Sequence, residues 1–471
     1  MERSGMAWAV RFANLILMGA ASILFLASLH TGYSYVWTHS KHFTHPQAIL
    51  LYVGAPAAAG IVLFLCLRLQ PLRKLKFVLS LASSVFAIYG AEYFLARIAT
   101  HLDSLTAERV ERARTLGVRF DSRSRIEVIE EFEKRKVAAV PAVTPFLLLN
   151  RAPGGELRSA VGHQETELLP LGGISQRPTV FCNELGEYVV YKSDEHGFNN
   201  PLSIWSSDRL DVAIVGDSNA HGACVEPERS FVGLIRNQIT KTLTLGGNGN
   251  GPLLMLASLR EYLPRLSPKY VLWFHCEGND LGDLIREKNS PLLIRYLRTE
   301  FTQGLRGRQD AIDRVLQDFV DRERRAVKGG LSLSETLKLT RLRQSMGLVY
   351  GSARNAPAPI QPNPGDFDLF REILLRADRT ASSWKGKLMF VYLPAWDRYN
   401  SHDAQSTKDR EKVLNIVRQL QIPIIDIHEA FQNSKDPLAF FPFRYNGHYN
   451  HAGQELVANR VLESINAGAA F

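Results

Sequence analysis

Apolar residues follow two different patterns along the chain. In the first hundred residues they form three long and nearly unbroken stretches, Phe12–Leu29, Ala48–Leu67 and Phe77–Ala96. Each is close to the roughly 17–25 residues that a helix needs to cross the hydrocarbon core of a bilayer. A cleaved signal peptide would explain the first stretch but not the two that follow it. We therefore predict a membrane anchor of three transmembrane helices in residues 1–100.

The positive charges around these stretches predict how the anchor is oriented. Arg3 and Arg11 precede the first stretch and four Lys or Arg residues lie within 68–76, whereas the loop between the first two stretches has only Lys41. Lys and Arg in short loops stay on the cytoplasmic side of a membrane. The N-terminus is therefore expected inside. The chain beyond Arg97 is then expected in the periplasm, with the anchor in a bacterial inner membrane.

Residues 101–205 are predicted to form a stalk followed by a loop-rich lead-in. Charged residues are frequent in 104–136, where Ser124 and Glu127 have the spacing of a capping box, in which each side chain satisfies a free backbone N–H at a helix start. Proline and glycine then recur up to residue 205 and prevent long helices. Two short strands are expected in this lead-in, Thr179–Cys182 and Tyr188–Tyr191.

From residue 206 to residue 471, short apolar runs alternate with stretches of helical periodicity. This alternation is typical of βαβ units, in which helices cover both faces of a buried parallel sheet. A helix-rich insertion at about 285–375 interrupts the series. The pattern predicts an α/β domain whose parallel strands are Val212–Val215, Thr242–Leu245, Tyr270–Phe274, Lys387–Leu393 and Pro423–Ile427.

Composition narrows the functional classes. The net charge is +9, but no stripe of Lys or Arg is interleaved with aromatic residues, so nucleic acid is not an expected partner. The 4 cysteines lack zinc-ribbon spacing, and His221 and His275 have no partners at metal-ligand spacing. Between Arg286 and Arg343, 14 basic residues stand against 8 acidic ones, an excess of 14 − 8 = 6. This excess fits either a solvated helical face or a surface for anionic glycans or lipid head groups.

The candidate chemistry begins where the first strand of the α/β domain ends. There the sequence reads Gly216-Asp217-Ser218. In an open α/β sheet, ligands bind outside the carboxyl ends of the strands, so a serine in this turn is placed to meet a substrate. A serine that merely caps a helix fits the same short pattern.

Three later segments supply groups that complement a nucleophile. Residues 246–251, after the second strand, are rich in glycine and let backbone N–H groups approach an oxyanion, but they lack the lysine of a phosphate-binding loop. Asn279, after the third strand, offers an amide donor. His448 can act as a base, and His451 could compete for that role. Together with the serine, these groups indicate acyl transfer through a serine nucleophile.

Ser218, Gly249, Asn279 and His448 carry a resemblance to the SGNH (GDSL-type) family of esterases and lipases, whose four motif blocks are named for these residue types. The resemblance covers about residue 206 to the end and implies a flavodoxin-like three-layer α/β/α domain. It implies that Ser218 is the nucleophile, Gly249 and Asn279 oxyanion donors, and His448 the general base. No cofactor or metal is implied. Four neighbouring residues are expected to contact the substrate: Asp217, Asn219, Asp280 and Asn446.

Two positions depart from the family. Its last block has an aspartate three residues before the histidine, and Tyr445 occupies that place here. Such an aspartate orients the imidazole and stabilises the imidazolium, so a backbone carbonyl or a distant acid must replace it, or the activity is reduced. Glu277 replaces the first glycine of the third block, while the Asn279-Asp280 pair that follows is intact.

The anchor and the resemblance together predict a membrane-anchored periplasmic serine esterase or O-acyltransferase. Its substrates are expected to be acyl esters, acetyl esters above all, on cell-surface or exported polysaccharide, or a small acyl ester. The expected partners are the lipid bilayer and a membrane-embedded acyltransferase or polysaccharide export proteins. The alternative is a catalytically weak protein that binds glycan during polysaccharide export, which the missing aspartate favours.

Two cysteines are placed to form a disulfide. Cys66 lies in the second apolar stretch and Cys276 at the end of a strand, whereas Cys182 and Cys224 lie in loop-like sequence. Disulfides persist in oxidising compartments such as the periplasm. We hypothesise a Cys182–Cys224 bridge that ties the lead-in to the edge of the active site.

Overall fold

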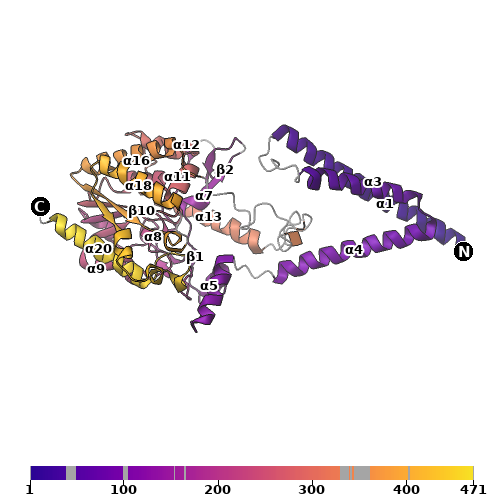
Figure 1. Ribbon diagram of the computed structural model, residues 1–471, viewed down its shortest axis with the longest axis horizontal. Coiled ribbons are helices and arrows are strands. Elements are labelled where there is room, and N and C mark those ends of the chain that lie inside the picture. Colours follow the sequence, from indigo (N-terminus) through magenta and orange to yellow (C-terminus); the bar gives the residue numbers. More distant parts are fainter. Residues whose placement is uncertain are drawn as a thin grey trace. The chain divides into compact units, whose positions relative to one another are not determined.

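The computed structural model describes residues 2–38, 49–98, 104–152, 154–163, 166–328, 339, 342–343, 361–400 and 404–469. The chain divides into two compact units (Figure 1). The first comprises Met1–Ala99 with Leu331–Tyr350, and the second comprises Thr100–Gly330 with Gly351–Phe471.

The first unit is built from apolar helices. α1 (Glu2–Thr38) and α4 (Pro71–Ile98) contain the two segments that are long and apolar enough to cross a membrane, Met6–Tyr33 and Pro71–Leu95. We predicted three such helices, whereas the described residues contain two. The middle stretch forms a shorter apolar helix whose α-helical part, α3 (Ala55–Leu65), has 11 residues and follows a π-helical turn, η2 (Leu50–Gly54). At about 1.5 Å per residue, α3 spans roughly half of a bilayer core.

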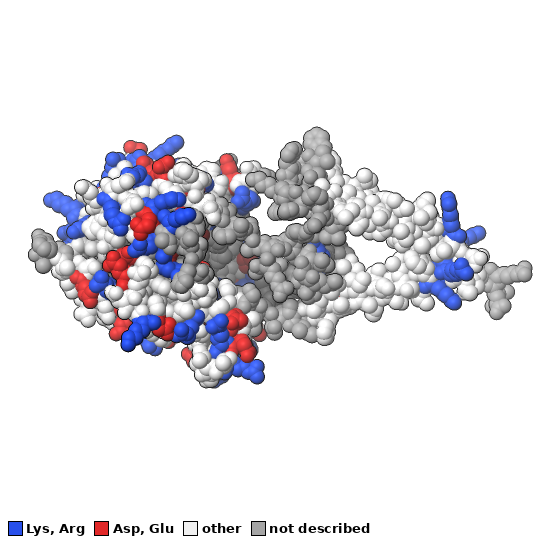
Figure 2. Space-filling model, viewed as in Figure 1, with Lys and Arg blue, Asp and Glu red and all other residues white. Residues whose placement is uncertain are grey.

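Charge is distributed differently over the two units. The helices of the first unit show few charged side chains, and those visible are basic and gather toward one end of the helices (Figure 2). Lys74 of α4 donates to Asn14 of α1 over 2.8 Å, which brings the basic loop and the start of the chain together. The surface of the second unit carries both signs of charge interspersed (Figure 2).

A five-stranded parallel sheet forms the centre of the second unit. The strands are β8 (Val212–Val215), β9 (Thr242–Thr244), β10 (Tyr270–Cys276), β11 (Lys387–Leu393) and β12 (Ile424–Asp426). They lie in the order β12-β11-β10-β8-β9, and each neighbouring pair is parallel. This is the flavodoxin-like order, in which the chain reverses direction across the sheet between the first and third strands. The predicted fold class and all five predicted strands are confirmed.

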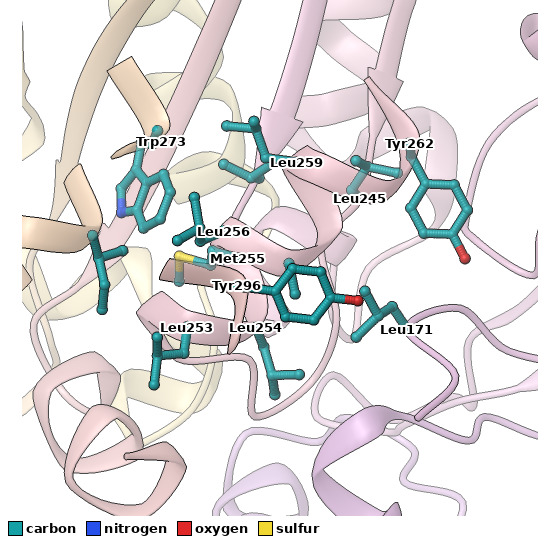
Figure 3. Close-up of a cluster of buried hydrophobic side chains, with 14 of the residues drawn as sticks. Leu171, Leu245, Leu253, Leu254, Met255, Leu256, Leu259, Tyr262, Trp273 and Tyr296 are labelled. Carbon is teal, nitrogen blue, oxygen red and sulfur yellow. The ribbon is translucent and has the colours of Figure 1, made fainter. Parts of the chain in front are cut away.

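Helices cover both faces of this sheet because alternate strand residues point to opposite sides. On one face, Ala213 and Trp273 pack against α10 (Pro252–Tyr262), α16 (Pro364–Ser382) and α18 (Ala404–Gln419). Figure 3 shows Trp273 beside residues of α10 in this core. On the other face, Ile214 and Phe274 pack against α9 (Phe231–Gln238), α19 (Ile427–Gln432) and α20 (His451–Ala469). Figure 1 shows α16 and α18 on one side of β10 and α9 and α20 on the other. The domain is a three-layer α/β/α sandwich.

The segment predicted as a stalk and lead-in packs within this same unit rather than as a separate body. Its helices are α5 (Ser104–Thr115) and α6 (Arg125–Lys134), and the expected capping box of Ser124 and Glu127 is present at the start of α6. A small sheet of order β1-β6-β7 follows. The remaining lead-in elements are β1 (Val140–Pro141), α7 (Pro145–Leu148), β2 (Leu149–Arg151), β3 (Leu157–Ser159), β4 (Gly162–His163), β5 (Thr166–Glu167), β6 (Pro178–Val180), β7 (Val190–Lys192) and η4 (Ile204–Ser206).

The helical insertion lies between β10 and β11, as predicted. Apart from α16, its described elements are α11 (Asp280–Glu287), α12 (Pro291–Ile294), η6 (Arg295–Leu297), η7 (Leu305–Gly307) and α13 (Gln309–Lys328). Most of the predicted basic stretch beyond residue 328 lies outside the described residues. The other short helices are η3 (Cys66–Arg68), α8 (Ser218–His221), η5 (Pro227–Arg229), α17 (Asp397–Asn400), η9 (Pro437–Phe440) and η10 (Pro442–Arg444).

Candidate active site

Ser218 begins the short helix α8, and two residues separate it from the end of strand β8. Asp217 is the N-cap of α8, and its carboxylate accepts a hydrogen bond from the Asn219 backbone N–H over 2.9 Å. A glycine is needed at 216, since a Cβ there would lie 2.6 Å from the Cβ of Ala220. The turn places Ser218 at the carboxyl end of the sheet where β8 has β9 on one side and β10 on the other. That edge is where open α/β sheets bind their ligands.

His448 lies next to this serine, although the chain separates them by 230 residues. The loop between η10 and α20 carries the histidine, and its Nε2 is 2.7 Å from Ser218 Oγ. A neutral imidazole with Nε2 unprotonated can accept the hydroxyl proton at this distance. Ser218 is 5% exposed and the His448 side chain 24% exposed, so the pair is largely sheltered but reachable from solvent.

The other side of the imidazole faces a buried carboxylate. Glu184 Oε1 is 3.1 Å from His448 Nδ1, and Glu184 Oε2 accepts a hydrogen bond from the His448 backbone N–H over 2.7 Å. Arg109 Nη2 is 2.9 Å from Glu184 Oε1. Neither Glu184 nor Arg109 was predicted from the sequence, because neither belongs to the motif blocks.

These neighbours shift the pKa of both partners. Burial raises the pKa of Glu184, but the charges of His448 and Arg109 and the hydrogen bonds from His448 outweigh burial and bring that pKa to about 2. Burial lowers the pKa of His448, but the charge of Glu184 and its hydrogen bond outweigh burial, so the histidine pKa lies above its ordinary value. The result is a permanently ionised carboxylate beside a base of raised proton affinity.

Gly249 lies in the loop after β9 with a φ of +74°, a conformation that favours glycine. A Cβ at this position would lie 2.6 Å from the ring of Phe146, a residue of α7 in the lead-in. The guanidinium carbon of Arg286 lies over the same Phe146 ring, 3.6 Å from its centroid. The glycine loop is therefore backed by the lead-in and by α11.

Asn279 is the N-cap residue of α11 and lies beside the nucleophile turn. Its amide nitrogen donates to Asp217 Oδ2 over 3.2 Å and to Asp283 Oδ2 over 3.0 Å. Burial, with the charge of Asp217, raises the pKa of Asp283 to about 7. The amide is thus aimed at the turn that carries Ser218 and is already held there by two carboxyl groups.

The residues expected to contact substrate have other contacts in the structure. Asp217 and Asp280 are almost fully buried, at 1% and 0% exposure. Asp280 Oδ2 accepts from the Cys276 backbone N–H over 3.1 Å, so it closes the end of β10. The Asn219 amide contacts Asp217, and the Asn446 carbonyl accepts from Arg109 over 2.8 Å. These four residues therefore have hydrogen-bond partners within the chain, and their contact with a substrate stays a prediction.

Three other histidines have partners other than the serine or are neutral because they are buried. His451 contacts Glu226 over 2.7 Å, so His448 rather than His451 is the histidine at Ser218. His221 is buried and its Nε2 is 3.0 Å from the hydroxyl of Tyr191, and burial lowers its pKa to about 4. Burial likewise lowers the pKa of His275 to about 3. Both are neutral at physiological pH.

The predicted disulfide is present in the structure. Cys182 and Cys224 are bonded, with their Cα atoms 5.2 Å apart. The bridge joins the loop after β6, two residues before Glu184, to the segment that follows α8. It therefore ties the lead-in to the edge of the site, as hypothesised.

Glu184, Cys224 and His448 bring potential metal-ligand atoms within 4.8 Å of one another. Cys224 is bonded to Cys182 and so offers no thiolate, which is the form of cysteine that binds metal ions. His448 Nδ1 is turned to Glu184. This donor set fits a hydrogen-bonded carboxylate–imidazole pair beside a disulfide better than a metal centre.

In sequence, no family model and no curated protein matches the chain. Solved structures similar to it include a lipolytic G-D-S-L family protein from Veillonella parvula, with 14% identity and a TM-score of 0.29, covering 54% of this chain and 97% of the other. A lipase/acylhydrolase from Enterococcus faecalis has 13% identity and a TM-score of 0.31, covering 55% and 96%. An acetyl xylan esterase has 12% identity and a TM-score of 0.31, covering 54% and 98%. Likeness at this level does not decide the function, which has to follow from the geometry above.

Proposed function

We propose that the chain is a serine ester hydrolase or O-acyltransferase that works through an acyl-enzyme on Ser218. The observation that carries this proposal is the 2.7 Å contact between Ser218 Oγ and His448 Nε2 at the carboxyl end of the parallel sheet. Two residues from distant parts of the chain meet there in the geometry of a nucleophile and its base.

The first step is attack of Ser218 Oγ on the ester carbonyl carbon, while His448 Nε2 takes the hydroxyl proton. The tetrahedral intermediate then collapses: the bond to the leaving alkoxide breaks, and the imidazolium returns the proton to that oxygen. In the second step a water or a sugar hydroxyl attacks the acyl carbon while His448 takes its proton. The bond between Ser218 Oγ and the acyl carbon then breaks, and the imidazolium returns the proton to Oγ. Hydrolase and transferase differ only in this second acceptor.

The oxyanion of the intermediate is assigned to the backbone N–H groups of Ser218 and Gly249 and to the Asn279 amide. The positive φ of Gly249 and the placement of Asn279 on the nucleophile turn support this assignment. For Asn279 to donate to the oxyanion, its bond to Asp217 or to Asp283 must be exchanged. Preorganised donors of this kind typically contribute about 2.7–4 kcal/mol each to transition-state stabilisation.

Features in the rest of the chain support a compartment and a substrate class for this activity. The two long apolar helices support attachment to a bilayer, and the Cys182–Cys224 bridge supports an oxidising compartment. With the basic end of the first unit held in the cytoplasm, the second unit reaches the periplasm of a bacterial inner membrane. Acetyl esters of cell-surface or exported polysaccharide are the substrates accessible there, with membrane-embedded acyltransferase or export proteins as partners.

The argument for the alternative, a catalytically weak glycan-binding protein, is weakened. It rested on the missing aspartate at Tyr445, and a carboxylate does reach His448 Nδ1 in the structure, from Glu184.

Covalent labelling tests the proposed function directly. A fluorophosphonate probe on the full chain in detergent is expected to label Ser218, and purified protein is expected to hydrolyse p-nitrophenyl acetate. Ser218→Ala, His448→Ala and the double variant should fall to a similar residual rate, because the hydroxyl and its base act as one unit. Full activity of Ser218→Ala, or the absence of labelling on folded wild-type protein, would show that this serine is not a nucleophile.

A further inference from the structure

Glu184 belongs to a different part of the chain from the two residues of the proposed acyl transfer. Ser218 and His448 both lie within the α/β region that starts at residue 206, whereas Glu184 lies in the lead-in, between β6 and β7, and 264 residues before His448. Its side chain is 9% exposed. Because Glu184 lies outside the motif blocks, other contacts must hold its carboxylate at the imidazole of His448.

The loop of His448 is shaped to receive this carboxylate. A Cβ at Gly447 would lie 2.7 Å from Glu184 Oε2 and 3.1 Å from Arg109 Nη2, so a larger residue there would displace the Glu184 carboxylate from its place. The carboxylate then spans the backbone N–H and the Nδ1 of His448. Two contacts from one carboxylate fix both the position and the ring orientation of the imidazole, with Nδ1 protonated and Nε2 free to accept.

Arg109 closes the other side of Glu184. It comes from α5, and the same Nη2 that lies 2.9 Å from Glu184 also donates to the Asn446 carbonyl over 2.8 Å. Arg109 is 7% exposed, so this is an interior ion pair. Removing one partner of a buried pair is strongly unfavourable, because the other charge remains unpaired. Arg109 therefore holds the carboxylate to the loop of the base.

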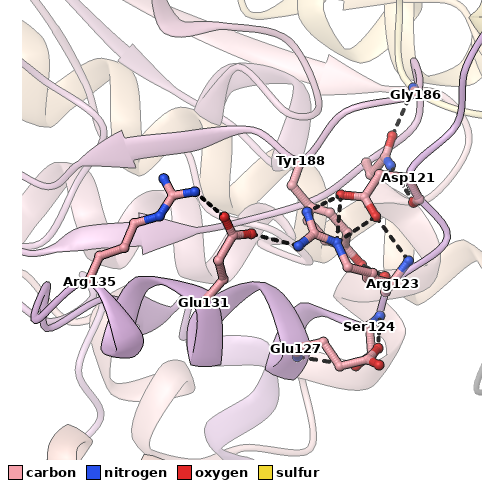
Figure 4. A network of polar contacts seen from close by, with 9 residues as sticks. Asp121, Arg123, Ser124, Glu127, Glu131, Arg135, Gly186 and Tyr188 are labelled. Atoms are coloured by element: carbon pink, nitrogen blue, oxygen red, sulfur yellow. Dashed lines mark hydrogen bonds and ion pairs between the residues drawn. The ribbon is translucent and has the colours of Figure 1, made fainter.

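The loop that carries Glu184 is tied at both ends. Cys182 is bonded to Cys224 on the side of the serine. On the side of the lead-in helices, the Asp121 backbone N–H donates to the Gly186 carbonyl over 2.7 Å, and the Tyr188 hydroxyl donates to the Arg123 carbonyl over 2.9 Å (Figure 4). The loop between these ties is short, so Glu184 has little freedom to leave the imidazole.

We propose that Glu184 is the acid that positions His448 for catalysis, and that Arg109 of α5 positions Glu184. This inference rests on the proposed acyl transfer and adds to it that the α/β domain does not hold a complete catalytic set. The lead-in supplies the missing member, in place of the carboxylate expected at Tyr445.

The charged and titratable groups that face His448 predict how its pKa responds to substitution. Glu184 from the β6–β7 loop and Asp217 from the β8 turn raise that pKa, whereas burial and Arg109 lower it. His221 of α8 is also near, and it is neutral because burial lowers its pKa to about 4. Cys224 is in the disulfide and does not titrate. The effect of Glu184 is larger than that of Arg109, so a substitution that takes Glu184 off the imidazole must lower the pKa of His448, whether Glu184 or Arg109 is changed.

The test is the pH dependence of kcat/KM for p-nitrophenyl acetate, together with the rate of fluorophosphonate labelling of Ser218, on the full chain in detergent. Activity needs neutral His448, so the acidic limb of each profile follows its pKa. Glu184→Gln is expected to lower kcat by about 10²- to 10⁴-fold and to move the limb to lower pH. Arg109→Gln is expected to release Glu184, and therefore to lower kcat and move the limb to lower pH as well, and Arg109→Lys is expected to restore a limb near that of wild type.

Two substitutions serve as matched controls. Glu187→Gln changes an exposed acid in the same loop, and Arg114→Gln changes an arginine of α5 whose side chain is 82% exposed. Both should keep the wild-type limb and rate. A merely structural role of Glu184 or Arg109 would lower the rate without moving the limb to lower pH.

The outcomes separate this inference from the proposed function. If wild-type protein labels at Ser218 but the Glu184→Gln limb stays in place or moves up, Glu184 does not position His448. If the Glu184→Gln chain is recovered unfolded, the Arg109→Gln and Arg109→Lys pair still decides, because an unchanged limb in Arg109→Gln overturns the role of Arg109 and of the carboxylate it holds. Loss of labelling in wild type itself would instead overturn the proposed function.

Discussion

At the level of single residues, the surroundings of Glu184 set its charge. Moving an isolated carboxylate out of water costs several kcal/mol, and hydrogen bonds to a charged group return about 1.5–3 kcal/mol each. Glu184 has two such contacts from His448 and an ion pair with Arg109. Its pKa therefore falls to about 2 in spite of burial.

A depressed carboxyl pKa makes stability depend on pH in a known direction. The contribution of ionised Glu184 is complete above its ordinary pKa of about 4.5 and is lost as the pH falls through about 2. We expect the free energy of unfolding of wild type to fall between these pH values more steeply than that of Glu184→Gln. Urea titrations followed by tryptophan fluorescence at several pH values measure this difference. Equal slopes would mean that Glu184 is not paired in solution.

Asn279 carries a second prediction at this scale. Asn279→Ala removes one proposed oxyanion donor and is expected to lower kcat by about 10²- to 10³-fold with KM little changed. Asn289→Ala is the matched control, because the Asn289 amide donates only to backbone carbonyls at the end of the same helix. A change confined to KM would place the Asn279 amide in substrate binding instead.

The sequence predicts Ser218 and His448 because each stands in a short local motif after a recognisable element. Glu184 has no such motif. Its role depends on a fold that brings together positions 264 residues apart, which no spacing rule records. The available signal was indirect: Cys182 lies two residues before Glu184, and the predicted bridge to Cys224 already placed this loop at the edge of the site.

At the level of elements, buried strands were the easiest to predict. Runs such as Val212–Val215 are apolar on both faces because helices cover both, and their ends differ from prediction by at most a few residues. The middle apolar stretch was harder to predict, because composition alone does not show that a π-helical turn at Leu50–Gly54 precedes the α-helix. The segment predicted as a stalk shows the same limit: charge patterning identified α5 and α6 but not what they pack against.

The disulfide gives a prediction for the β6–β7 loop as an element. If the bridge holds Glu184 in place, reduction with dithiothreitol should lower kcat and move the acidic limb to lower pH, as Glu184→Gln does. The measurement uses a Cys66→Ser/Cys276→Ser background, since these are the free cysteines and the reductant then acts on the bridge alone. A reduced enzyme with the wild-type profile would show that the other ties of the loop suffice.

At the level of the whole molecule, the two units differ in kind. The first is a set of apolar helices whose exposed surface suits lipid, and the second is an α/β unit that includes the lead-in. The sequence predicts an anchor that ends near residue 100, because hydropathy changes abruptly there. It did not predict that the lead-in and the α/β domain share one compact unit.

Topology is the prediction that belongs to this scale. Alkaline phosphatase fused after Leu102 is expected to be active, because the basic end of the apolar helices should remain in the cytoplasm and the second unit should be exported. A fluorescent protein that folds only in the cytoplasm, fused at the same position, is the control and should stay dark. The opposite pair of results would place the second unit in the cytoplasm.

The bridge between Cys182 and Cys224 also bears on when the protein becomes active. Both cysteines are synthesised long before His448, but the cytoplasm keeps thiols reduced. A newly made chain can therefore contain Ser218 and His448 while the loop that carries Glu184 is not yet held by the disulfide. Maturation would then coincide with oxidation after export, which makes the time of activation a property of the compartment and spares esters inside the cell.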